Sequence, residues 1–189
     1  KKLEVGLAVL MDVEIASFSL RIRSLVEDMR IQWRDLDQRI TAFDEEFRAY
    51  SRSDKACRLL TTIPGIGPLN ATAFVAAIDN AQTFSRGRDL AAWLGLVPRQ
   101  MTTGGKPRLL GISKRGNGYL RKMLIHGARA ALPTLSKDKT ILGSWLRNLL
   151  ARAHFNKVVV ALAAKMARII WSVLRSGIGF KALTIELSA

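Results

Sequence analysis

Apolar residues recur every three or four positions along the first fifty residues of the chain. Neither glycine nor proline interrupts the sequence between positions 7 and 63. A stripe of this kind, sustained over about five heptads, is typical of a coiled coil or a long antiparallel helix pair. A single amphipathic helix packed on its own domain is the alternative. We favour the coiled coil because so long a helix exceeds what the rest of the chain could cover. The stripe consists of Ile15, Phe18, Ile22, Leu25, Met29, Trp33, Leu36, Ile40, Phe43, Phe47 and Tyr50.

After position 50, shorter apolar runs are separated by polar or glycine- and proline-rich breaks, which predicts a series of short helices. Ser53 or Asp54 is suited to cap the first helix. Pro133 is expected to end another, and Gly177 suits the position after the last. The predicted helices span 54–62, 69–78, 89–94, 116–132, 141–153 and 157–174, with a hairpin turn at 63–68 and loops at 79–87 and 98–111. No strand alternation is evident, so the predicted fold class is all-α.

These elements divide the chain into two predicted domains. Residues 1–52 are expected to form a coiled-coil or dimerisation helix, and residues 53–189 a compact helical domain. The longest apolar stretch, Val158 to Leu174, contains Lys165 and Arg168 and is short for a bilayer span of about 20 residues. We therefore interpret it as a buried core helix.

The charge balance points to a polyanion as the partner. The chain has 30 lysines and arginines against 15 acids, a formal net charge of +15, and residues 90–185 hold 17 bases and a single acid, Asp138. A field of that sign favours nucleic acid first and an anionic membrane second. The membrane is disfavoured because the bases do not lie opposite one exposed apolar face. Cys57 is the only cysteine, which excludes an internal disulfide and suits a reducing cytosol. We expect a cytoplasmic, nucleoid-associated protein.

One motif is typical of nucleic-acid binding through phosphates. The segment Leu59-Leu-Thr-Thr-Ile-Pro-Gly-Ile-Gly-Pro-Leu-Asn-Ala-Thr-Ala73 resembles a helix-hairpin-helix motif, which would span about 56–78. Gly65 and Gly67 would let the backbone turn sharply and approach a ligand closely. The amides that begin the second helix would then form a small anion site, which in such motifs holds a DNA phosphate without reading bases. A tight corner between two helices that only packs is the alternative.

A second basic segment spans about 98–116. Residues 90–137 contain nine bases and no acid. Two hydroxyls precede Gly104-Gly105 and a lysine, and another hydroxyl, Ser113, precedes Lys-Arg-Gly. This composition suits a loop that handles phosphates. Besides Gly65 and Gly67, we expect nucleic-acid contacts from Lys106, Arg108, Lys114, Arg115, Arg121 and Lys122.

Other residues of interest carry weaker signals. His126 and His154 have no cysteine or acid at ligand spacing, so no zinc site is predicted. The bases between 141 and 174 are unopposed by acids, and we interpret them as a nucleic-acid face, with a solvated face as the alternative. They are Arg147, Arg152, Lys157, Lys165 and Arg168.

Five short motifs occur in an order that resembles one protein family. They are Ile-Pro-Gly-Ile-Gly, Leu-Gly-Leu-Val-Pro-Arg-Gln, Thr-Gly-Gly-Lys, Leu-Gly-Ile-Ser-Lys-Arg-Gly-Asn and Ile-His-Gly-Ala-Arg-Ala. Together they look like the C-terminal half of the insertion-sequence transposases of family one-ten, nearest its eleven-eleven group. The resemblance is strongest from Leu59 to Leu132 and extends over the helices on either side.

The resemblance implies a DNA transposase or recombinase. A full member has an N-terminal RuvC-like domain whose DEDD acids bind a divalent metal, Mg²⁺. A coiled coil links that domain to a C-terminal domain that supplies a nucleophilic serine. Members assemble as dimers or higher oligomers on DNA, and some are guided by an RNA encoded in their own element. The expected partners are therefore DNA, a guide RNA and further copies of the chain through the N-terminal helix.

This sequence departs from the family pattern in two ways. Asp79, Asp89 and Asp138 have no DEDD-like motif around them, so no metal ligand is assigned here and the chain alone is expected to be inactive. The family's serine maps best onto Thr103, with Thr102 as the one-residue alternative.

Threonine keeps the hydroxyl but adds a methyl group and a stiffer χ1. Ser113 is the third candidate nucleophile, and we otherwise interpret it as a phosphate contact or helix cap. The alternative function is a non-catalytic helix-hairpin-helix module that binds DNA or structured RNA.

Overall fold

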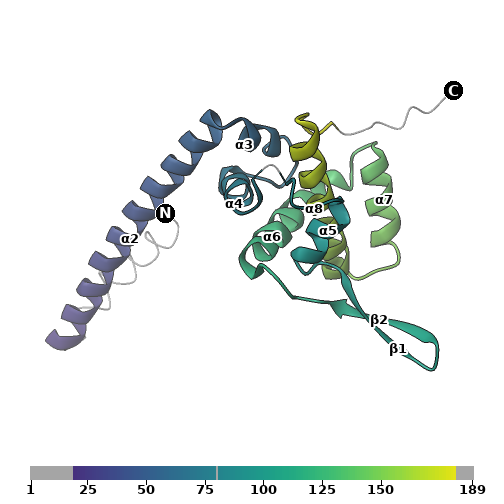
Figure 1. Cartoon of the computed structure of the whole chain (residues 1–189). Helices are drawn as coiled ribbons and strands as arrows, with labels where there is room; N and C mark the ends of the chain where they lie inside the picture. The colour runs from purple at the N-terminus through teal and green to yellow at the C-terminus, as the bar shows by residue number, and fades with distance from the viewer. Residues whose placement is uncertain (1–18, 80, 182–189) are drawn as a thin grey trace. The chain divides into compact units, whose positions relative to one another are not determined.

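The computed structural model describes residues 19–79 and 81–181 (Figure 1). These residues form seven helices and one two-stranded antiparallel sheet, which confirms the predicted all-α fold class apart from the small sheet. The helices are α2 (Leu20–Ser53), α3 (Lys55–Leu60), α4 (Pro68–Ile78), α5 (Gly87–Trp93), α6 (Gly118–Leu135), α7 (Ile141–Leu150) and α8 (Phe155–Ser176); the strands are β1 (Pro98–Thr103) and β2 (Lys106–Ile112).

Helix α2 carries the predicted apolar stripe. By its internal contacts, the part of this helix before Phe47 is a unit distinct from the region that begins at Phe47. The stripe side chains from Ile22 to Phe43 are exposed, as is Tyr50, and Phe47 is partly buried. Ile15 and Phe18 lie outside the described residues. The coiled coil stays a prediction. The helix that would form it, α2, exposes its apolar side chains to solvent.

We expect this stripe to mediate self-association. Replacing Ile22, Leu25 and Met29 with aspartate should lower the mass of the chain measured by light scattering, because three charges would enter the apolar seam. The control variant carries Ser24→Asp, Gln38→Asp and Ala42→Asp, which add the same charge to the opposite face of the helix. If both variants and the unmodified chain are monomers at high concentration, self-association through the stripe is excluded.

The short helix α3 begins where the sequence predicts. The Asp54 Oδ1 atom accepts a hydrogen bond of 2.7 Å from the Cys57 amide, so Asp54 is the N-cap. The other candidate, Ser53, donates its hydroxyl proton to the Tyr50 carbonyl at the end of α2. The cap lets the chain leave one helix and enter the next within a single residue.

The core of the region after Phe47 is built around α8. This helix packs against α3, α5, α6 and α7 (Figure 1). Its buried face confirms the interpretation of this stretch as a core helix, and Gly177 follows it with a φ of 66°, as a left-handed C-cap. The buried residues of α8 are Val158, Val159, Leu162, Ala163, Met166, Ala167, Ile170 and Val173.

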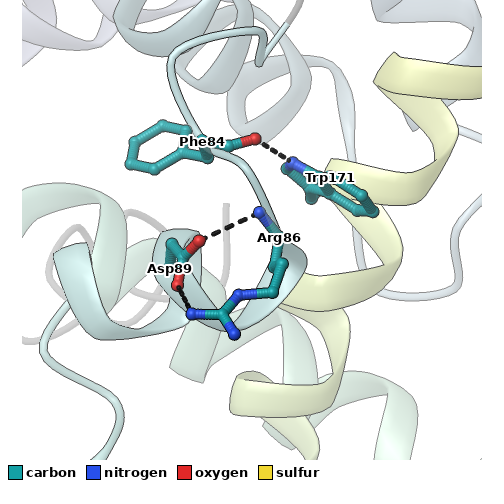
Figure 2. Close-up of polar contacts among 4 residues, drawn as sticks. All are labelled: Phe84, Arg86, Asp89 and Trp171. Atoms are coloured by element: carbon teal, nitrogen blue, oxygen red, sulfur yellow. Dashed lines mark hydrogen bonds and ion pairs between the residues drawn. The ribbon is translucent and has the colours of Figure 1, made fainter.

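Helix α5 is tied to α8 through the loop that precedes it (Figure 2). The Trp171 indole N–H donates a hydrogen bond of 2.8 Å to the Phe84 carbonyl. The Asp89 carboxylate accepts from the Arg86 amide at 2.9 Å and contacts the Arg86 guanidinium at 3.4 Å. Asp89 therefore serves to begin α5.

One segment differs from the predicted loop. Residues 98–112 form a β-hairpin, with Gly104 and Gly105 at its turn. The φ angles of these glycines, 56° and 76°, are those of a two-residue type I′ turn, which matches the twist of paired strands. The hairpin shows no apolar alternation because both of its faces are exposed. Its strands are held by their own backbone hydrogen bonds and turn chemistry.

Pro133 does not end its helix as predicted. It lies inside α6, which continues to Leu135. Proline removes one backbone donor and normally breaks a helix interior. Here Leu132 and Leu135 are both buried in the core, and the Ser136 amide still donates to the Leu132 carbonyl. Burial of these leucines holds the last turn in the helix. Helix α7 is also shorter than predicted and ends at Leu150.

Candidate nucleic-acid interface

The β-hairpin forms a basic arm, which we define as residues 98–112. The strands contact each other far more than they contact any described helix, and they extend away from the helices of this region (Figure 1). Thr103 pairs with Lys106 on either side of the turn, at the tip of the arm. Both residues are exposed. An arm of this shape can enter a nucleic-acid groove or reach into a neighbouring active site.

The strand register sorts the side chains of the arm onto two faces. Directly paired residues share a face, and so do residues two apart along a strand. Thr103 and Lys106 therefore lie on the face that also carries the Met101–Arg108 pair. Thr103 is thus the candidate nucleophile that shares its face with the two bases of β2.

Thr102 lies on the opposite face of the arm. It pairs with Pro107, and its Oγ1 atom accepts a hydrogen bond of 3.2 Å from the Gln100 side chain. The next pair on that face is Gln100–Leu109. The register therefore gives the two threonines different surroundings. The paired residues on the face of Thr103 include two bases, whereas those on the face of Thr102 include none.

Ser113 lies at the other end of the arm, just after β2. Its amide donates to the Val97 carbonyl at 2.8 Å. It is roughly 23 Å along the strand from Lys106, at about 3.3 Å per residue. Ser113 and Thr103 could not contact the same phosphate. Lys114 and Arg115 follow Ser113 and are both exposed.

The base of the arm is held by two glycines that sequence reasoning did not single out. A Cβ on Gly95 would lie 2.1 Å from the Arg115 carbonyl oxygen, and one on Gly116 would lie 1.8 Å from the Trp93 carbonyl oxygen. Both have positive φ, 70° and 81°. The end of α5 and the segment after β2 therefore touch backbone to backbone, which fixes where the arm leaves the helical core.

Arg121 has a structural partner at the same place. Its Nη1 atom donates to the Leu94 carbonyl at 3.0 Å and to the Arg115 carbonyl at 3.3 Å. The guanidinium is half-buried beneath the base of the arm, whereas the neighbouring Lys122 is exposed. The structure thus brings Lys106 and Arg108 together on the arm, places Lys114 and Arg115 at its base, and uses Arg121 to hold that base.

The corner between α3 and α4 gives its two glycines different environments. Gly65 has a φ of 87°, and a Cβ there would lie 2.4 Å from the Gly127 carbonyl oxygen on α6. The buried Asn70 side chain adds a 3.3 Å hydrogen bond to the Gly65 carbonyl. Gly67, by contrast, is the N-cap of α4, with no atom within 4 Å of an added Cβ and no side-chain cap. Gly65 is positioned for packing, and Gly67 is open to a ligand.

Several bases of the last two helices have intramolecular partners. Arg147 Nη1 donates to the Ser136 and Asp138 carbonyls, both at 2.9 Å. The Lys165 ammonium lies 4.9 Å from the centre of the Trp145 ring, and Arg168 Nε donates to the Ala164 carbonyl. Arg152 and Lys157 are exposed. Three of the five bases of this predicted nucleic-acid face therefore make contacts within the fold.

Comparison with known proteins places this arm and this corner in one family. Residues 57–140, which contain both, match the family described as Transposase IS116/IS110/IS902. The transposase for insertion sequence element IS1111A of Coxiella burnetii is 37% identical over 92% of this chain and 48% of its own length. The chain belongs to this family of insertion-sequence transposases.

Two further relatives agree with that assignment. A protein of Pseudomonas aeruginosa named as a probable family 20 transposase is 42% identical over 89% of this chain and 50% of its own length. The transposase for insertion sequence element IS1328 of Yersinia enterocolitica is 39% identical over 77% of this chain and 43% of its own length. The chain thus spans about half the length, or less, of these curated relatives.

The metal-binding acids implied by the transposase resemblance have no counterpart in the described part of this chain. Among residues 19–79 and 81–181, no group of three or more histidines, cysteines, aspartates or glutamates could hold a metal ion. Of the two histidines, His154 acts as a helix cap, since its Nδ1 atom accepts from the Asn156 amide. The described residues therefore do not fit a metal centre.

Two other features narrow the chemistry of this transposase domain. Burial, and then the hydrogen bond and negative charge of Asp54, raise the pKa of the Cys57 thiol to about 12. Cys57 is fully buried and would stay protonated, so it is not a candidate nucleophile. In the described ranges, no helix has the length and apolar character that a bilayer crossing requires.

Proposed function

We propose that this chain is the C-terminal, nucleic-acid-binding part of a transposase that cuts and rejoins DNA strands. In this proposal the arm presents the Thr103 hydroxyl to a scissile phosphate, and a RuvC-like domain outside this chain completes the active site. The observation that carries the proposal is the strand register, which gives Thr103 the same exposed face as Lys106 and Arg108.

The chemistry of the arm supports this role. A phosphodiester that approaches Thr103 would meet two cations on the same face, and their charge would offset the charge that develops on the phosphate oxygens during attack. Gly104 and Gly105 have open space where a Cβ would stand, so a strand can approach the turn closely. The paired residues on this face are Thr103 with Lys106 and Met101 with Arg108.

The alternative is a non-catalytic helix-hairpin-helix module that binds DNA or structured RNA. One observation favours it. The N-terminus of α4 has an exposed glycine cap and no side chain on its amides, as a phosphate site requires. The two functions are compatible, since the corner could hold a backbone phosphate while the arm reaches the reacting one. A guide RNA and further copies of the chain are partners that fit the same proposal.

Binding of duplex DNA by the arm has a direct test. The chain should bind a fluorescent 30-base-pair duplex with weak sequence preference, and log K should fall steeply with log salt, by about 0.9 per phosphate neutralised. Lys106→Gln with Arg108→Gln should make that slope shallower by about 1 to 2. Fluorescence anisotropy across a series of salt concentrations measures both quantities.

The matched control removes the same charge away from the arm, through Lys137→Gln with Lys139→Gln, two exposed positions after α6. If the two double variants change the salt slope equally, the arm contributes to DNA binding only through the total charge of the chain. Salt-independent binding by the unmodified chain would count against nucleic acid as the partner altogether.

A further inference from the structure

A cleft of about 430 Å³ lies beside the α3–α4 corner, wholly within the region that begins at Phe47. The last turns of α2 form one wall, and the end of α3, the corner and the first residue of α4 form the other. Neither the arm nor the base of the arm contributes to it. The residues that line this cleft are Arg48, Ser51, Arg52, Arg58, Thr61, Ile66 and Pro68.

The lining is positive and contains no acid. Three of its seven residues are arginines. The Arg58 Nη1 atom donates to the Arg52 and Ser53 carbonyls, at 2.7 and 2.8 Å. These bonds cover the negative C-terminal end of α2, which would otherwise repel an anion. They also fix the guanidinium in place while leaving its other nitrogens available as donors.

Two lining groups have unused hydrogen-bonding capacity. The Arg52 guanidinium makes no side-chain hydrogen bond or ion pair within the described residues and is exposed. Ser51 is 5% exposed, yet its hydroxyl has no partner among the described residues and its side chain lines the cleft. The Ser51 Oγ atom is not fully enclosed, because Asn70 Oδ1 is the only fully enclosed side-chain atom without a partner in the described residues. The hydroxyl can therefore donate to a group that enters the cleft.

The cleft also borders the positive end of a helix. Pro68 is the first residue of the 11-residue helix α4, whose N-terminus has no side-chain cap. Helix N-termini favour anions through their free amides and their dipole. Cations from α2 and α3 therefore meet the N-terminus of α4 at one place, and the Ser51 hydroxyl lies among them.

We infer that this cleft binds a backbone phosphate of duplex DNA, at a position separate from the phosphate reached by the arm. The inference rests on the proposed function, because it takes DNA as the partner. Arginine is suited to this ligand, since its planar fork can donate two hydrogen bonds to phosphate oxygens. A cleft open at the surface admits a phosphate that stays joined to its two sugars. The contact would position the duplex and would not read its sequence.

Arg52→Gln is the central variant, since the Arg52 side chain supports no other described contact. It should weaken binding of the 30-base-pair duplex several-fold at low salt and make the slope of log K against log salt shallower by about 0.9, the value for one phosphate. Ser51→Ala should weaken binding without lowering the thermal midpoint. Arg58 is left intact because it also caps α2.

The matched control is Lys55→Gln. Lys55 is exposed on α3 and carries the same charge, but it does not line the cleft. It should leave the salt slope unchanged. Because the cleft and the arm would hold different phosphates, Arg52→Gln combined with the Lys106→Gln and Arg108→Gln double variant should change the slope by the sum of the separate effects.

The outcomes separate this inference from the proposed function. If the unmodified chain binds and the arm variants act as expected, but Arg52→Gln behaves like Lys55→Gln, the cleft inference is wrong and the function stands. If inorganic phosphate raises the thermal midpoint of the unmodified chain but not of Arg52→Gln, while DNA binding is unchanged, the cleft is a small-anion site and the inference again fails. If the unmodified chain does not bind DNA, the proposed function itself fails.

Discussion

Replacing Gly65 with alanine is expected to destabilise the fold by about 2–6 kcal/mol. Two costs add. The new Cβ would lie 2.4 Å from the Gly127 carbonyl oxygen and 3.1 Å from the Ala131 Cβ, an overpacking cost of about 1–3 kcal/mol. The φ of 87° adds strain of about 1–3 kcal/mol for a residue with a side chain. The carbonyl belongs to a helix backbone packed in the core, so it cannot move aside cheaply.

Gly67→Ala is the matched control, two residues away. An added Cβ there meets nothing within 4 Å, and the φ of −88° is ordinary. The free energy of unfolding should change by no more than about 1 kcal/mol, the usual scale for an N-cap substitution. Denaturant unfolding followed by circular dichroism measures both variants. Equal stability of the two would mean that the Gly65–Gly127 contact can relax, contrary to the packing role argued for Gly65.

These two variants also separate the interpretations of the corner. A site on the amides of α4 predicts that Gly67→Ala weakens DNA binding at nearly native stability, since the Cβ narrows access to the helix N-terminus. A corner that only packs predicts unchanged binding by Gly67→Ala. The sequence pattern assigns both a sharp turn and close approach to a ligand to Gly65 and Gly67 together. In the structure, Gly65 makes the tight packing contact and Gly67 leaves room for a ligand.

The sequence could predict only those features of this corner whose contacts are local in the chain. The α3–α4 turn and the Asp54 cap were predictable because caps and glycine turns are local in the chain. The partner of Gly65 was not, because Gly127 lies 62 positions later in the sequence. A glycine within an otherwise helical pattern, as at 127, does signal a close approach. It does not say which backbone approaches.

The arm was missed for a different physical reason. Strand prediction rests on alternation between a buried and an exposed face, and neither face of this hairpin is buried. Its one local signal was Gly104-Gly105, a pair suited to a type I′ turn. Charge counts likewise could not separate the bases that support the fold, such as Arg121 and Arg147, from those exposed on the arm. That distinction depends on which carbonyls lie nearby.

The last and largest expected effect concerns the candidate nucleophile. In a full-length transposase that contains this chain, Thr103→Ala should abolish a covalent protein–DNA adduct while leaving DNA binding nearly intact. The adduct can be trapped by denaturation during the reaction, resolved by gel electrophoresis and mapped to a residue by peptide mass spectrometry. Binding should survive because Lys106 and Arg108, on the same face, are unchanged.

Three further variants make this test specific. Thr103→Ser should preserve or raise adduct formation, because the hydroxyl stays while the methyl group and the stiffer χ1 are removed. Thr102→Ala should have little effect, since Thr102 lies on the opposite face of the arm. Ser113→Ala should also have little effect, since Ser113 lies at the base of the arm. An adduct that survives Thr103→Ala would move the assignment to one of these two residues.

The expected reaction conserves phosphodiester bonds, which is why a protein nucleophile suits strand exchange. The Thr103 Oγ atom attacks phosphorus, an Oγ–P bond forms and a bond from phosphorus to one nucleoside oxygen breaks. The threonine proton leaves, and the departing oxygen gains a proton. A hydroxyl of the incoming strand then attacks the same phosphorus and releases Thr103. Within the described residues the Thr103 hydroxyl has no base as a hydrogen-bond partner, and in the proposed mechanism its activation comes from the RuvC-like domain outside this chain. The isolated chain should therefore bind DNA without forming the adduct, and adduct formation by the isolated chain would contradict this mechanism.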